Sequence, residues 1–211
     1  VKGDINDKKL IKEVLSKHKP RSIVNFAAET HVDNSIISPE AFINSNITGT
    51  FNLLTAVLEF YLSLSFEEKE KFKFLHVSTD EVFGSLKLDD DKSTELSAYR
   101  PNSPYSASKA ASDHLVRAWA ETFNLPVNIT NCTNNYGPHQ HTEKLIPLLI
   151  SNCLNWKKLP IYGDGKNIRD WLFVEDHCEA ICEVLDKGKV GETYNIGGNN
   201  QTSNIEITQK I

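Results

Sequence analysis

Two pairs of side chains in this sequence have the types and the spacing that proton transfer requires. Asp80 and Glu81 are adjacent acids in the stretch STDEVFG, directly after the apolar run FLHV. Tyr105 and Lys109 lie four residues apart in YSASK, a spacing that places both side chains on one face of a helix. A nearby ammonium group favours the phenolate form of a tyrosine and so lowers its pKa. The sequence therefore predicts an acid–base site built from these two motifs.

Each motif also has an ordinary structural interpretation. Adjacent acids after a strand can form a solvated turn or the first turn of a helix, and Y-x-x-x-K is a common helix start with the lysine in water. Neighbouring residues of a regular strand point to opposite faces. Asp80 and Glu81 can therefore serve one substrate only if the strand ends before them.

Helical and strand patterns alternate along the chain, which favours an α/β fold with a doubly wound parallel sheet, Rossmann-like, and a smaller C-terminal substrate-binding lobe. Ser38 before Pro39, and Pro104, are typical of helix starts. The predicted helices cover 7–18, 39–62, 104–123, 144–155 and 175–188, and another begins near 204. The predicted strands cover 21–26, 71–77, 126–130 and 192–198, with short extended pieces at 159–163 and 169–174 and a polar loop at 85–103.

Polar clusters follow three of these strands immediately. They are AAETH at 27–31, STDEVFG at 78–84 and NCTNNYGP at 131–138. Ligands of open parallel sheets bind beyond the carboxyl ends of the strands. Packing alone does not require polar residues at all three places, so we expect one site at this edge of the sheet.

Composition excludes several classes of protein. The 211 residues are 39% hydrophobic and 24% charged, as in soluble globular proteins, and the net charge of −5 argues against nucleic acid as a partner. No apolar run approaches the roughly 20 residues of a membrane span. The four cysteines form no C-x-x-C pair and are expected to be buried thiols of a cytoplasmic protein. HQH at 139–141 has no third ligand at a useful spacing, so no metal site is predicted.

At this point the sequence resembles the extended short-chain dehydrogenases/reductases and, within them, the dTDP-glucose 4,6-dehydratases. The matching stretches are GDIND at 3–7, FAAETHVDNS at 26–35, NITGT at 46–50, STDEVFG, PYSASKA at 104–110, TNCTNNYGP at 130–138, EKLIP at 143–147, LPIYGDG at 159–165 and IRDWLFVEDH at 168–177. The resemblance implies a lyase of deoxysugar biosynthesis that uses NAD and a nucleotide sugar, dTDP-glucose. It also implies a homodimer, with the helices around 47–62 and 104–123 as candidates for the pairing surface.

The family's N-terminal glycine-rich turn, G-x-x-G-x-x-G, is missing from this sequence. We therefore expect an internal segment of a longer protein. Residues 1–135 and 171–198 would form an NAD-binding domain without its N-terminal part. Residues 136–170 and 199–211 would form a nucleotide-sugar-binding lobe without its C-terminal part.

The resemblance also implies catalytic roles. Tyr105 takes the proton of the C4 hydroxyl while NAD accepts hydride, and Lys109 lowers the tyrosine pKa. Thr79 hydrogen-bonds the C4 oxygen. Glu81 then removes the C5 proton as general base, and Asp80 protonates the departing C6 hydroxyl as general acid. Two nearby carboxyl groups split their pKa values, which suits one base and one acid.

The remaining site residues are carried over from the same resemblance. Those expected to contact the cofactor are Asp4, Ile5, Ala27, Ala28, Tyr105, Lys109 and Asn135. Those expected to contact the substrate are Thr30, Thr79, Asn134, Lys144, Leu145, Pro160, Ile161, Tyr162, Arg169 and Asn204. A guanidinium binds oxyanions in pairs of hydrogen bonds, which suits Arg169 to a pyrophosphate, the alternative being a surface salt bridge with Asp170.

Three other functions remain open from the sequence. A nucleotide-sugar 4-epimerase needs the tyrosine base and NAD but removes no water, so the acid pair favours dehydration. A 4,6-dehydratase for a GDP-, CDP- or UDP-sugar would carry the same catalytic residues. A non-catalytic NAD-binding scaffold would not require Tyr105 or Lys109, and both are present.

Overall fold

The computed structural model describes residues 1–87, 89–161 and 163–211, and the chain divides into two compact units. The first unit comprises Val1–Asn131 and Glu183–Asn195, and the second comprises Cys132–Cys182 and Ile196–Ile211. The assignment of a cofactor domain and a sugar lobe to parts of the chain stays a prediction. Among the described residues, no helix combines the length and the apolar character that crossing a bilayer requires.

The first unit is built on a sheet with the strand order β1-β2-β3-β6. These strands are β1 (Ser22–Asn25), β2 (Lys73–Thr79), β3 (Val127–Cys132) and β6 (Thr193–Ile196). β1 and β2 pair in parallel, with Ser22 opposite Lys73 and Asn25 opposite His76. With helices packed on this sheet, the predicted Rossmann-like α/β class is confirmed.

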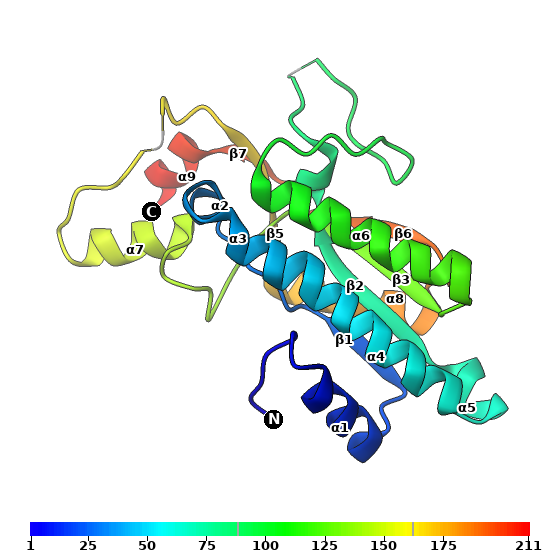
Figure 1. Cartoon of the computed structure of the whole chain (residues 1–211). Coiled ribbons are helices and arrows are strands. Elements are labelled where there is room, and N and C mark those ends of the chain that lie inside the picture. Colours follow the sequence, from blue (N-terminus) through cyan, green and yellow to red (C-terminus); the bar gives the residue numbers. More distant parts are fainter. Residues whose placement is uncertain (88, 162) are drawn as a thin grey trace. The chain divides into compact units, whose positions relative to one another are not determined.

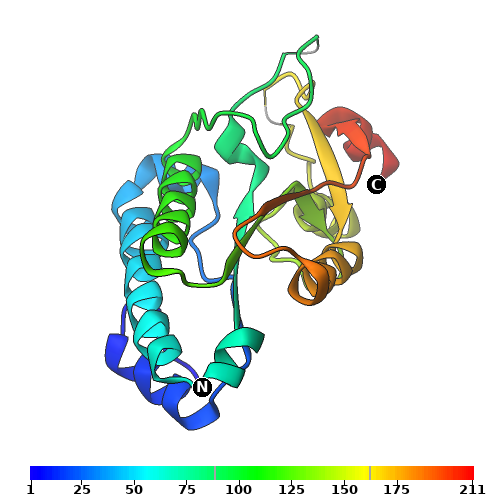
Figure 2. The ribbon, with the colours of Figure 1, turned by 90° about the vertical axis from the view of Figure 1, so that its right-hand side faces the viewer.

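Helices α4 (Thr50–Ser63) and α6 (Pro104–Phe123) lie side by side on one face of β1 and β2 (Figures 1 and 2). α6 begins where the sequence predicts, because Ser103 forms a capping box with Ser106 and Pro104 occupies the first turn. α1 (Lys8–His18) packs against α4 and begins at Asp7, whose side chain accepts a hydrogen bond from the backbone N–H of Leu10. The shorter helices α2 (Val32–Ile37) and α5 (Phe66–Lys71) were not predicted.

The predicted helix from Pro39 is continuous but changes its winding. It consists of α3 (Pro39–Phe42), a π-helical segment η1 (Ile43–Gly49) and α4. The wider turn of a π-helix is rare and is frequently found at functional sites. Its buried residues are Asn46 and Gly49.

The hydrophobic core of the first unit lies between the sheet and these helices. Leu54 and Val57 of α4, Phe74 of β2 and Val116 of α6 are fully buried there, together with Val127 of β3. Apolar residues on the inner faces of consecutive elements thus hold β2 against α6, which positions the acid–base motifs that follow.

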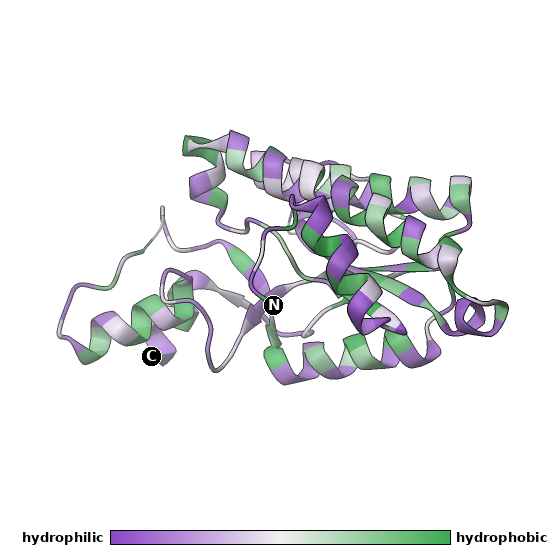
Figure 3. Ribbon diagram, turned by 60° about the horizontal axis from the view of Figure 1, so that its bottom comes forward, coloured by the Kyte–Doolittle hydropathy of each residue, from purple (hydrophilic) through white to green (hydrophobic). Residues whose placement is uncertain are grey.

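The second unit contains a smaller sheet with the order β4-β5-β7, formed by β4 (Asn134–Tyr136), β5 (Ile168–Phe173) and β7 (Gln201–Ser203). Its helices are α7 (Leu145–Leu154), α9 (Asn204–Lys210) and the first part of α8 (Val174–Lys187). β4 and β5 are parallel, whereas β5 and β7 are antiparallel. Figure 3 shows α7 as hydrophobic along most of its length.

Two expectations need correction. The extended piece predicted at 159–163 is not a strand over 159–161, and Tyr162 lies outside the described residues. Cys153, Cys178 and Cys182 are exposed, so the predicted burial of the cysteines is wrong for these three. Cys178 and Cys182 are four residues apart and so lie on one side of α8, and that side faces solvent.

Candidate active site

The acid pair lies in a tight turn that begins where β2 ends. β2 stops at Thr79, and a 3₁₀-helix, η2 (Asp80–Phe83), follows directly. The Thr79 hydroxyl accepts a hydrogen bond of 3.3 Å from the backbone N–H of Glu81 and lies 3.3 Å from Asp80 Oδ1. Gly84, with φ of 87°, ends the turn. The strand has therefore ended before Asp80, as shared use of both acids requires.

The acidic first turn has a structural role as well. Negative side chains are favoured at a helix N-terminus, where backbone N–H groups have no partner within the helix. Asp80 and Glu81 are half-buried there, while Thr79 is buried. The turn thus stabilises two carboxyl groups in a partly dry environment, whatever chemistry they perform.

Tyr105 and Lys109 are both buried on α6, with 8% and 4% exposure. Lys109 Nζ donates a hydrogen bond of 2.9 Å to the backbone carbonyl of Val77 on β2. The Tyr105 ring packs edge-on against Phe42, with 6.3 Å between the ring centroids. The alternative of a solvated lysine at an ordinary helix start is therefore wrong for this protein.

Asn46 is a residue of this region that the sequence analysis missed. Its buried side chain accepts from the backbone N–H of Glu29 at 2.8 Å and donates to the Glu29 carbonyl at 3.0 Å. It also donates to Ser108 Oγ at 2.8 Å, and Ser108 donates to the carbonyl of Tyr105 at 2.7 Å. Asn46 therefore ties the loop after β1 to the helix that carries Tyr105. An asparagine inside a helix was the available signal, because this residue type competes with the helix for backbone hydrogen bonds.

The predicted cofactor residues of the first unit lie near the end of β1 and beside η1. Ala27 is exposed and Ala28 half-buried just beyond the strand. Ile5 packs so closely on Gly49 that a Cβ there would lie 2.4 Å from Ile5 Cγ2. Asp4 accepts a hydrogen bond of 2.7 Å from the backbone N–H of Asn6. Thr30, a predicted substrate contact in the same loop as Ala27, is exposed.

The other predicted contacts belong to the second unit. Asn135 Oδ1 lies 2.8 Å from Nδ1 of His177, whose pKa burial lowers. Arg169 is exposed, and Asp170 accepts instead from the backbone N–H groups of Gly198 and Asn200, so the described ion pairs include no Arg169–Asp170 bridge. The remaining residues lie on β4 (Asn134), at the start of α7 (Lys144 and Leu145), before residue 162 (Pro160 and Ile161) and at the start of α9 (Asn204).

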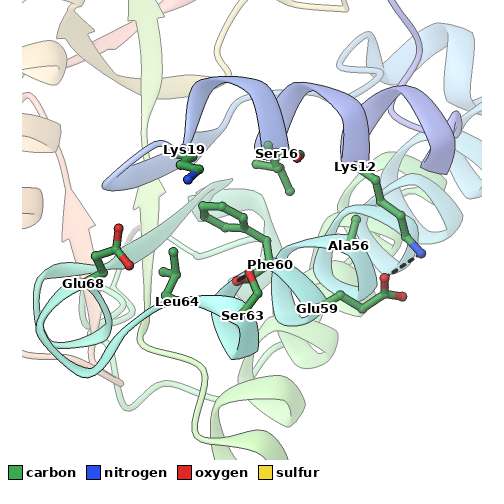
Figure 4. Close-up of a pocket in the computed structure, with 10 residues that line it drawn as sticks. Lys12, Ser16, Lys19, Ala56, Glu59, Phe60, Ser63, Leu64 and Glu68 are labelled. Carbon is green, nitrogen blue, oxygen red and sulfur yellow. Dashed lines mark hydrogen bonds and ion pairs between the residues drawn. The ribbon is translucent and has the colours of Figure 1, made fainter.

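A separate pocket of about 290 Å³ lies between α1 and α4. Figure 4 shows its polar rim, where Lys12 and Glu59 form an ion pair 2.6 Å long. The lining contains none of the predicted site residues, and it comprises Lys12, Leu15, Ser16, Lys19, Ala56, Glu59, Phe60, Ser63, Leu64 and Glu68. No cluster of three potential metal ligands occurs within the described part of the chain.

A buried Tyr–Lys pair on a helix against a Rossmann-like parallel sheet defines the class of protein, the short-chain dehydrogenases/reductases. A model of the family described as GDP-mannose 4,6 dehydratase matches residues 1–211, and the chain belongs to this family.

Relatives and solved structures agree with this assignment. The chain is 58% identical over 211 residues to a dTDP-glucose 4,6-dehydratase of Xanthomonas campestris pv. campestris (strain B100), covering 100% of this chain and 60% of the relative. The crystal structure of dTDP-glucose 4,6-dehydratase from Bacillus anthracis str. Ames in complex with NAD aligns with a TM-score of 0.87 and 48% identity, over 100% of this chain and 62% of that one. DesIV, a dTDP-glucose 4,6-dehydratase from Streptomyces venezuelae with NAD and TYD bound, aligns with a TM-score of 0.89 and 46% identity, over 99% and 61%. The chain thus spans about 60% of the length of the curated relatives it matches.

Proposed function

We propose that the protein containing this chain is an NAD-dependent dTDP-glucose 4,6-dehydratase, a lyase that forms dTDP-4-keto-6-deoxyglucose. The observation that carries the proposal is the burial of Tyr105 and Lys109 on α6, with Lys109 bonded to the strand that ends at Thr79. Relatives of more than 50% identity with this name support the choice of reaction.

The residues beyond β1 fit a dinucleotide. Ala27 and Ala28 are small and at least partly accessible, so a flat ligand can approach the backbone closely. Ile5 provides an apolar side chain beside η1 for an adenine ring. Held beside Ala27, Ala28 and Ile5, NAD would supply the hydride acceptor for oxidation at C4 and the hydride donor for reduction at C6.

The chain's own residues then move the protons. Tyr105, as phenolate stabilised by the Lys109 charge, removes the C4 hydroxyl proton, and Thr79 donates a hydrogen bond to the C4 oxygen. The ketone formed at C4 acidifies the C5 proton, which Glu81 removes. Asp80 protonates the C6 hydroxyl so that it leaves as water. Because C5 and C6 are bonded neighbours, the turn at Asp80–Phe83 suits both transfers.

The second unit would hold the nucleotide end of the substrate. Arg169 is exposed on β5 and offers paired N–H donors to a pyrophosphate. Asn135 would contact the nicotinamide end of the cofactor. The remaining proposed substrate contacts are Thr30 of the first unit and Asn134, Lys144, Leu145, Pro160, Ile161, Tyr162 and Asn204 of the second.

A homodimer through α4 and α6 is part of the proposal. Phe51 of α4 and Phe123 of α6 are exposed, and each ring contacts Trp119 in an edge-to-face arrangement. Aromatic residues of this kind are enriched in the buried centres of interfaces. The cytoplasmic location stays a prediction from the sequence.

The test is incubation of the full-length protein with dTDP-glucose. A 4-keto-6-deoxy sugar is expected, seen as the ultraviolet band that such ketosugars develop in alkali. Recovery of dTDP-galactose would instead identify a 4-epimerase. Faster turnover of a GDP-, CDP- or UDP-sugar would reassign the nucleotide. If none of these sugars gave up hydride to NAD, the protein would be a non-catalytic scaffold.

A further inference from the structure

A buried carboxyl group lies one helical turn beyond Lys109 and has no part in the proposed chemistry. Asp113 is 2% exposed, and its Oδ2 accepts hydrogen bonds from Ser78 Oγ at 2.7 Å and Tyr99 Oη at 3.0 Å. Asn131 Nδ2 adds a third donor at 3.4 Å. The other carboxylate oxygen, Asp113 Oδ1, lies 3.4 Å from His76 Nε2. Burying a carboxylate costs free energy unless hydrogen-bond donors compensate its charge, so packing alone does not explain this cluster.

One branch of this network reaches the acidic turn. The Asn131 amide that contacts Asp113 also donates to the backbone carbonyl of Thr79 at 3.1 Å. Ser78, the residue before Thr79, is bonded to Asp113 directly. Thr79 in turn caps η2 through the N–H of Glu81. Asp113 therefore contacts the chain on both sides of Thr79, directly at Ser78 and through Asn131 at the Thr79 carbonyl.

The other branch reaches the loop after β1. The N–H of Ala27 donates to Asn25 Oδ1 at 3.1 Å, which fixes the orientation of that amide. The NH₂ of Asn25 then faces His76 Nδ1 at 3.1 Å, so Nδ1 is an acceptor and the proton is on Nε2. Ser112 leads to the same tautomer, because its hydroxyl donates to the Lys109 carbonyl and leaves its oxygen to accept from Nε2 at 3.2 Å.

The electrostatics keep these donors in their bonding forms. Burial lowers the pKa of His76, the Lys109 charge lowers it further and Asp113 opposes both, so the ring is neutral. Burial raises the pKa of Tyr99 and the negative Asp113 raises it again, so the phenol keeps the proton that it donates. Among the described residues, Asp113 Oδ1 has no hydrogen bond, so His76 Nε2 approaches it at 3.4 Å without bonding to it, whereas the other contacts of the network between Ala27 and Thr79 each pair a donor with an acceptor.

We propose that Asp113 is a positioning residue for the reaction, because it holds the loop after β1 and the acidic turn after β2 in a fixed relation to each other. The inference rests on the proposed function, since Ala27 borders the cofactor there and Thr79 contacts the substrate. Asp113 itself touches neither ligand and works through Asn25, His76 and Asn131.

The kinetic test compares Asp113→Asn in the full-length protein with Glu121→Gln, an exposed acid on the same helix. The Asn side chain has an NH₂ group in place of one carboxylate oxygen, and the groups around Asp113 are all hydrogen-bond donors. Two donors then face each other, and we expect the acidic turn to shift. We expect kcat to fall about 10-fold to 100-fold, as small misplacements do, with KM for dTDP-glucose changed less than about 3-fold. If Asp113→Asn does not fold, Tyr99→Phe replaces it in the same comparison. This variant removes one donor to Asp113 and keeps the ring packing, so we expect a smaller loss of kcat. A lower Tm with unchanged kcat in the variants that fold would overturn the proposal.

A second measurement does not depend on the substrate. Nitrogen-15 NMR of histidine-labelled protein, assigned with His76→Gln, is expected to show a neutral His76 with its proton on Nε2. A proton on Nδ1, or a charged ring at neutral pH, would overturn the network even in an active enzyme. Wild-type protein that does not turn over dTDP-glucose, but shows the expected tautomer, would instead refute the proposed function and the positioning role while leaving the network in place.

Discussion

The side-chain ammonium of Lys109 donates a hydrogen bond to the backbone carbonyl of Val77 over 2.9 Å. Val77 lies two residues before Thr79 on β2, so the contact fixes the lysine against the strand from which the acidic turn begins. Because Lys109 is almost fully buried, water contributes little to stabilising its charge. Its distance from Tyr105 along the chain is one turn of α6, so the pair is in place before a substrate binds.

Tyr105→Phe is expected to slow oxidation of the sugar and leave substrate binding nearly unchanged. Removal of a general base costs about 10²-fold to 10⁴-fold in rate, and the ring packing against Phe42 is retained. The measurement is the rise of NADH absorbance in a single turnover. Tyr61→Phe, a ring that packs on Phe72 of the core, is the matched control. Hydride transfer at the wild-type rate would contradict the assignment of the base.

Glu81→Gln is expected to separate the two halves of the reaction. The amide cannot remove the C5 proton, so NADH should form and persist while the 4-keto-6-deoxy product falls by about 10²-fold or more. Rapid-quench analysis of the sugar, alongside absorbance, distinguishes the steps. Glu40→Gln, an exposed acid on α3, is the control. Normal product formation would remove Glu81 from the role of base.

Asn46→Ala is expected to destabilise the first unit by roughly 1–3 kcal/mol, the cost of leaving buried polar groups without partners. The substitution deletes the contacts to Glu29 and Ser108, which join the loop after β1 to α6. Urea denaturation measures the loss. Asn44→Ala, an exposed position in the same π-helical segment, should change stability by less than about 0.5 kcal/mol. Equal losses at both positions would refute the importance of these contacts.

Gly84→Ala is expected to destabilise the acidic turn through two effects. Its φ of 87° is strained for an L-residue, and a Cβ would lie 2.3 Å from the carbonyl oxygen of Arg100. Gly191 has nearly the same φ, 88°, but open space around its Cβ position. Gly191→Ala therefore measures strain alone, at about 1–3 kcal/mol. Gly84→Ala should lower Tm and activity further, and an equal loss at the two sites would show that the contact with Arg100 is unimportant.

Acidification is expected to destabilise the protein through His76. Burial and the Lys109 charge lower its pKa against the opposing effect of Asp113, so the unfolded chain binds a proton that the folded chain does not. Stability is then complete above the unfolded pKa of about 6.5 and falls below it, by up to about 1.4 kcal/mol per pH unit until the folded pKa is reached. Urea denaturation over this range should give a smaller slope for His76→Gln. His177 adds a similar contribution, and His18→Gln, at an exposed position, is the control.

Local signals predicted the elements that carry the catalytic motifs. Pro104 marks the start of α6, so the position of Tyr105 follows from sequence. The apolar pattern predicts a strand over 71–77, and β2 lies two residues further on, at Lys73–Thr79. The requirement that the strand end before the acids could also be stated in advance. The structure shows the turn that meets it, capped by Thr79.

Features that depend on distant partners could not be predicted in this way. Asn46 and Ser108 are 62 positions apart, and His76 and Asp113 belong to different elements, so no local pattern indicates either contact. The π-helical winding of η1 is hidden because its composition suits an ordinary helix equally well. β4 and β7, at three residues each, are too short to show a strand period.

The close approach of Gly84 and Arg100 has a consequence for how sequences of this family can vary. Arg100 donates its backbone N–H to the carbonyl of Val82 at 2.9 Å, so the two ends of the polar segment between them meet at the acidic turn. Because this hydrogen bond holds the two ends of the loop together, a change in loop length has little effect on the turn. Each doubling of the length adds only about 0.6 kcal/mol to the entropic cost of closing the loop. Insertions and deletions between Gly84 and Ser93 should therefore accumulate during evolution while Asp80 and Glu81 keep their geometry. The acidic turn is in this sense insulated from the part of the chain most open to change.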